Sequence, residues 1–144
     1  MQDMKSLAGE YQQKLQNDVR IRAEAELLKS MGPQAWADLR KLIKAKVMEF
    51  NTEMKSESLS WDSLESNQVS IRNATSGRKL LGGYDDAAST IHFKCPSAKI
   101  DLACVILMQG GEAVFQQTNT PNGIPVVLSK EEIASGLLRQ FLLN

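Results

Sequence analysis

The chain has 144 residues, of which 17 are basic and 17 are acidic. This length suits a single domain, 1–144, whose core is large enough to fold without metal ions or disulfides. The balanced charge provides no basic surface that would follow a phosphate backbone, which excludes nucleic acid as the expected partner. No apolar run reaches the about 20 residues that span a bilayer, and the N-terminus lacks the apolar segment of a signal peptide. We therefore expect a cytoplasmic protein that binds no membrane.

Residues 1–54 form a helical segment, which the pattern divides into two helices. Apolar residues recur at intervals of three and four from Met4 to Val19, and again from Trp36 to Met54. Between them stands Ser-Met-Gly-Pro at 30–33, where glycine and proline both disfavour a helix. The first helix is therefore expected to end near residue 30, and the second to begin at Pro33.

Residues 55–67 connect the helices to the rest of the chain. This stretch reads KSESLSWDSLESN and contains five serines, which is typical of an irregular connection. Its Trp61 has two interpretations: a ring that stacks on a ligand, or an anchor that holds the connection on the protein. Because a large aromatic side chain gains most from burial, the anchor is the favoured interpretation.

Residues 68–128 are predicted to form an antiparallel sheet of five or six strands. From Gln68 the apolar period changes from a helical one to two, which is typical of a half-buried strand. The most apolar run, IDLACVILM at 100–108, suits a central strand. The last strand, 126–128, follows Pro125 and is placed at an edge of the sheet. The expected strands centre on 69–71, 80–84, 91–94, 100–108, 114–115 and 126–128.

One pairing register places most apolar residues of these strands on a single face. It pairs Cys95 with Ile100, Met108 with Ala113, Leu80 with Phe93, and Ile71 with Gly82. The shared face then carries Val69, Ile71, Leu80, Tyr84, Ile91, Phe93, Ile100, Leu102, Cys104, Ile106, Met108 and Phe115. A slip of one residue in any pair would send that strand's apolar set to the other face. The same register separates Cys95 from Cys104 by about 13 Å along the strand, too far for a disulfide, so both are expected to be free thiols.

Residues 129–144 are predicted to form a C-terminal helix. Ser129 followed three residues later by Glu132 is the signature of a capping box at a helix start. The whole pattern predicts an α+β fold. It has an antiparallel five- to six-stranded meander, with two N-terminal helices and one C-terminal helix packed on it.

The chain has no glycine-rich phosphate loop and no HExxH motif, so no catalytic residue, cofactor or metal site is predicted. One cluster is a candidate ligand site: Arg72, His92, Lys94 and Asp101 share the polar face of the predicted sheet and could hold an anionic group. The alternative is an ordinary solvated face with one weak ion pair. Asp85 and Asp86 are interpreted as turn formers and not as a catalytic pair.

Two hypotheses for function remain. The first is a small interaction module that self-associates through its N-terminal helices and also has a possible protein partner, because a long apolar helix stripe seldom stays in water. The second is a small-ligand (anion) binding protein or enzyme that uses the polar sheet face. The absence of a catalytic set favours a role that is not enzymatic.

Overall fold

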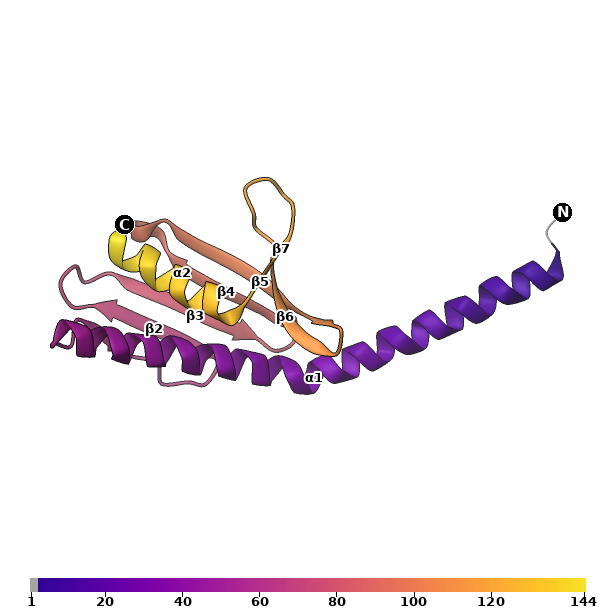
Figure 1. The fold of residues 1–144 in the computed structure, drawn as a ribbon, viewed down its shortest axis with the longest axis horizontal. Coiled ribbons are helices and arrows are strands. Elements are labelled where there is room, and N and C mark those ends of the chain that lie inside the picture. Colours follow the sequence, from indigo (N-terminus) through magenta and orange to yellow (C-terminus); the bar gives the residue numbers. More distant parts are fainter. Residues whose placement is uncertain (1–2) are drawn as a thin grey trace.

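The computed structural model describes residues 3–144, so residues 1–2 of the predicted helical segment lie outside the described part. The fold is α+β: a seven-stranded antiparallel sheet with one long N-terminal and one C-terminal helix (Figure 1). The strands follow one another in chain order, which makes the sheet a meander. The elements are α1 Met4–Met54, β1 Leu59–Trp61, β2 Gln68–Asn73, β3 Lys79–Asp85, β4 Thr90–Cys95, η1 Pro96–Ala98, β5 Ile100–Gln109, β6 Glu112–Gln117, β7 Val126–Leu128 and α2 Lys130–Leu143.

The prediction of two N-terminal helices is wrong, because α1 continues through Pro33 without a break. Gly32 is buried beside Tyr84, and a Cβ there would lie 3.2 Å from the Tyr84 hydroxyl oxygen. Glycine at this position therefore serves a close approach between helix and sheet and does not end the helix. Pro33 has no N–H to donate to the carbonyl of Lys29 one turn earlier, but Lys29 is exposed, so water can satisfy that carbonyl.

The prediction of five or six strands is also wrong, since β1 lies inside the predicted connection 55–67 and makes the total seven. β1 has only three residues and pairs with β2, Trp61 lying opposite Ile71. On α1, Asn51 bonds both backbone groups of Leu59: its amide donates to the carbonyl at 2.8 Å and its oxygen accepts from the N–H at 2.9 Å. A helix side chain thus occupies the outer side of this edge strand. Trp61 is half-buried against α1, with the guanidinium of Arg40 5.3 Å from its ring centre, which fits the anchor interpretation.

The register of the sheet agrees with the prediction in its central part. Cys95 lies opposite Ile100 and Met108 opposite Ala113, as expected. The two earlier pairings differ by two residues, since Gly82 and not Leu80 lies opposite Phe93, and Leu80 and not Gly82 lies opposite Ile71. A shift of two preserves the face on which each side chain lies, so the apolar face is the predicted one.

Both helices pack on this apolar face, and among residues 3–144 no helix covers the opposite face of the sheet (Figure 1). From α1, Trp36, Leu39, Ile43 and Val47 enter the core. From α2 the core receives Ile133, Ala134, Leu137, Leu138 and Phe141. We call residues 28–144, in which α1 contacts the rest of the chain, the body.

The start of α2 is held by the predicted capping box. The Ser129 hydroxyl accepts from the Glu132 backbone N–H at 3.0 Å, and the Glu132 carboxylate accepts from the Ser129 N–H at 3.1 Å. We expect Ser129→Ala to lower the free energy of unfolding by about 1 kcal/mol, because one helix donor loses its partner. Urea unfolding followed by circular dichroism measures this loss. An unchanged midpoint would show that the cap does not stabilise the docked helix.

Candidate functional site

The N-terminal part of α1 extends away from the body (Figure 1). Every residue from Met4 to Leu27 is exposed, and we call this segment the arm. Asp3 caps its start, and the Asp3 side chain accepts a hydrogen bond from the Lys5 backbone N–H at 3.2 Å. At a rise of about 1.5 Å per residue the arm is about 36 Å long. An isolated helix is only marginally stable in water, and most helical stability in proteins comes from packing. The arm, whose described residues are all exposed, therefore gains little of this packing energy within residues 3–144.

The arm carries large apolar side chains in an ordered pattern. Met4 is 68% exposed, Tyr11 59% and Val19 65%. Apolar residues stand at intervals of four along the whole arm. We call this series the ridge, and its members are Leu7, Tyr11, Leu15, Val19, Ala23 and Leu27. Scattered apolar residues on a surface need no explanation, but a continuous stripe on a helix is a feature of interaction sites.

Where α1 enters the body, a groove of about 710 Å³ opens between α1, β6, β7 and the start of α2. Its apolar lining includes Met31, Ala35, Phe115 and Leu128. The two carboxylates of Asp38 and Glu112 also line the groove. No pattern in the sequence indicates this groove, because its lining comes from segments that are separated in the chain, 31–38, 112–115 and 127–132.

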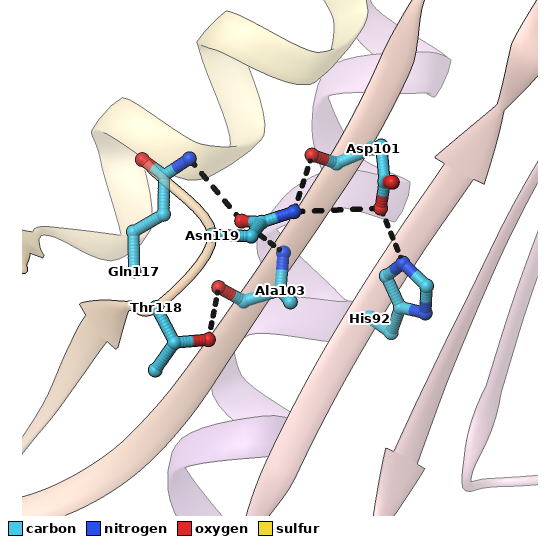
Figure 2. Close-up of polar contacts among 6 residues, drawn as sticks. All are labelled: His92, Asp101, Ala103, Gln117, Thr118 and Asn119. Atoms are coloured by element: carbon cyan, nitrogen blue, oxygen red, sulfur yellow. Dashed lines mark hydrogen bonds and ion pairs between the residues drawn. The ribbon is translucent and has the colours of Figure 1, made fainter. Parts of the chain in front are cut away.

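The open face of the sheet carries the predicted ligand cluster. His92 Nε2 lies 2.6 Å from Asp101 Oδ1, and Figure 2 shows the imidazole directed at this carboxylate from the neighbouring strand. Lys94 lies opposite Asp101 in the β4–β5 ladder. Arg72 stands on β2, two strands from β4, in the row that contains Lys79. The structure thus brings together three of the four predicted residues and leaves Arg72 apart from them.

Asn119 joins this cluster from the loop after β6 (Figure 2). Its amide nitrogen donates to the Asp101 carbonyl at 2.9 Å, and its oxygen accepts from the Ala103 N–H at 3.0 Å. The side chain therefore replaces the backbone partner that β5 lacks beyond the end of β6. No sequence signal identified Asn119, since its contacts depend on the path of a loop.

The chemistry of this cluster is limited. The Asp101 carboxylate lies between His92 and Asn119, so a negative charge occupies the position where an anion would have to bind. The His92 and Asp101 side chains are both more than half exposed, and exposed ion pairs of this kind contribute little energy. The geometry fits a surface contact that links β4, β5 and the following loop.

The remaining polar candidates have structural roles. Asp85 Oδ1 accepts from the N–H groups of Ala87 at 3.0 Å and Ala88 at 3.3 Å, as a turn former does. Burial, followed by the hydrogen bond to Asp86 and the charges of both aspartates, raises the pKa of Tyr84 to about 12. Both cysteines are free and buried, as predicted, and burial raises the pKa of Cys104 to about 11. Among residues 3–144 no three potential metal ligands lie together.

Comparison with known proteins gives no assignment: no family model, curated protein or solved structure matches this chain. Within the described part of the chain, no helix combines the length and the apolar character needed to cross a membrane.

Proposed function

We propose that this chain is a small cytoplasmic protein-interaction module that self-associates through its arm. The observation that carries the proposal is the ridge of the arm, whose apolar side chains are all exposed in the described part of the chain. Burial of one such side chain from water contributes roughly 1.5–3 kcal/mol when it is complete. A ridge of this length therefore provides enough apolar surface to hold two helices together.

The charge of the arm supports a protein partner. Four basic residues balance four acidic ones: Lys5, Lys14, Arg20 and Arg22 against Glu10, Asp18, Glu24 and Glu26. A helix that binds anionic lipid or nucleic acid carries a clear excess of lysine and arginine. A neutral helix with an apolar stripe instead fits another helix of the same kind. The commonest closed assembly of identical chains is a two-fold dimer.

The test compares two substitutions of the same chemistry on the arm. Leu15 belongs to the ridge, whereas Ile21 is similarly exposed, at 56% against 45%, but lies about 120° around the helix from Leu15. We expect Leu15→Glu to give a monomer, because a carboxylate in an apolar contact must lose its hydration. The control Ile21→Glu is expected to remain a dimer.

Light scattering on the purified proteins at high micromolar concentration gives the masses. Thermal unfolding of the body should be the same in both variants, since neither residue contacts it. If both variants stay dimeric, the interface lies elsewhere. If the unsubstituted chain is monomeric under these conditions, the proposal is wrong.

A further inference from the structure

The spacing of the ridge determines how two arms can pack. An α-helix has about 3.6 residues per turn, so each step of four residues advances about 40° around the axis. The ridge from Leu7 to Leu27 therefore winds around the arm and does not form a straight seam. A left-handed coiled coil needs a mean spacing of 3.5, which this series does not have. Rows of residues at intervals of four pack instead with the helix axes crossed at about −50°.

We infer that two copies of the chain cross antiparallel at Leu15, with a two-fold axis beside this residue. This inference rests on the proposed self-association and specifies its geometry. The axis places Leu15 of one copy level with Leu15 of the other, and residues equally far before and after Leu15 level with each other. Tyr11 of each copy then lies level with Val19 of the other, so a large side chain is opposite a small one at two symmetric places. A crossed pair touches mainly within these turns and separates beyond them.

The charged residues beside the ridge fit this arrangement. Lys14 and Asp18 lie one turn apart on the same side of the arm. The two-fold axis preserves that side and places Asp18 of the second copy level with Gln12. Asp18 of the second copy is therefore displaced from Lys14 by only about 3 Å along the helix axis. Each copy therefore offers a lysine to an aspartate of the other, and the contact occurs twice by symmetry. A parallel two-fold pair in register would instead place Lys14 and Asp18 of one copy on the opposite side of the contact from Lys14 and Asp18 of the other, so these pairs would not form.

The length of the arm gives a second, independent argument. Its first and last residues, Met4 and Leu27, are placed symmetrically about a point next to Leu15. In the antiparallel pair, the two arms cross near their midpoints, and each body lies on the opposite side of the crossing from the other body. Parallel pairing would place both bodies, each wider than a helix (Figure 1), at the same end.

Cysteine cross-linking of the full chain tests the geometry. Leu15→Cys alone should form a disulfide-linked dimer on mild oxidation, because the two positions meet at the axis. Leu7→Cys alone should not, since two copies of residue 7 would be about 24 Å apart along the axis. The unsubstituted chain is the background control, and its own cysteines are buried. Cross-linking of both variants with equal yield would overturn the antiparallel arrangement in favour of a parallel one.

Mixed pairs distinguish a crossing from a long side-by-side contact. Tyr11→Cys mixed with Val19→Cys should give the heterodimeric product in good yield, whereas Leu7→Cys mixed with Ala23→Cys should give little. Equal yields from both mixtures would show that the arms run together along their whole length, which contradicts the crossing. Light scattering on the same samples after reduction shows whether the chain self-associates at all, independently of the geometry. A dimer with the wrong cross-links overturns this geometry alone, and a monomer overturns the proposed function with it.

Discussion

Replacement of Trp36 by alanine is expected to lower the free energy of unfolding by about 3–5 kcal/mol. Trp36 joins α1 to the sheet: it is 3% exposed, stacks on Tyr84 with 5.8 Å between ring centres, and lies 6.1 Å from Phe93. Its indole N–H also donates to the Ser66 carbonyl at 2.7 Å. The substitution leaves a cavity at the centre of this contact and removes the hydrogen bond to the Ser66 carbonyl. Since small domains are stable by only about 5–15 kcal/mol, this loss is a large part of the total.

Urea denaturation measures this loss, and the chain offers a matched control in its other tryptophan. Trp61 lies half-buried at the edge of the sheet, so Trp61→Ala should cost clearly less. The loss for Trp36→Phe should lie between the losses for the two alanine variants, because phenylalanine keeps an aromatic ring but cannot make the hydrogen bond. An equal loss for the two alanine variants would contradict the position of Trp36 in the core.

The second large effect is expected at Gly82. A Cβ at this position would lie 2.5 Å from two ring carbons of Phe93, which is fully buried, and 3.3 Å from the Cβ of Val69. Gly82→Ala therefore forces the Phe93 ring out of its place, and we expect a loss of about 3 kcal/mol.

Gly83 is the control, because it lies next in the chain and on the other face. A Cβ there would find only the Asn67 carbonyl oxygen, at 3.9 Å. Gly83→Ala should leave the melting temperature nearly unchanged, while Gly82→Ala lowers it by many degrees. If the two variants melt together, Gly82 does not lie opposite Phe93 and the observed β3–β4 register is wrong.

The sheet shows what the sequence can determine. Short, well-marked turns fix the register of β4, β5 and β6, and this part of the prediction is confirmed. The turns on either side of β3, 74–78 and 86–89, carry no signal that selects one register, and the prediction there is wrong by two residues. There the prediction paired apolar with apolar, Leu80 with Phe93, whereas the fold uses Gly82 to make room for the phenylalanine ring.

The helix shows why a local signal can mislead. Glycine and proline at 32–33 usually mark a helix end, and the prediction followed them. The ridge, however, continues at the same interval of four through Met31 and Ala35 to Leu39, and this continuity is the signal of one helix. The alternation of the strands placed the His92 and Asp101 side chains on one face. Their contact with Asn119 depends on loop geometry that no pattern in the sequence determines.

Sedimentation equilibrium of the full-length chain tests the self-association through the arm most directly. One chain has a mass of 15.9 kDa. We expect the fitted mass to approach twice this value at high micromolar concentration. It should return to the monomer value for a chain that begins at Asn17 and so lacks the first half of the ridge, including Leu15 at the proposed crossing. A full-length chain that stays at the monomer mass at every concentration would contradict self-association, and a dimer that survives the truncation would contradict the role of the arm.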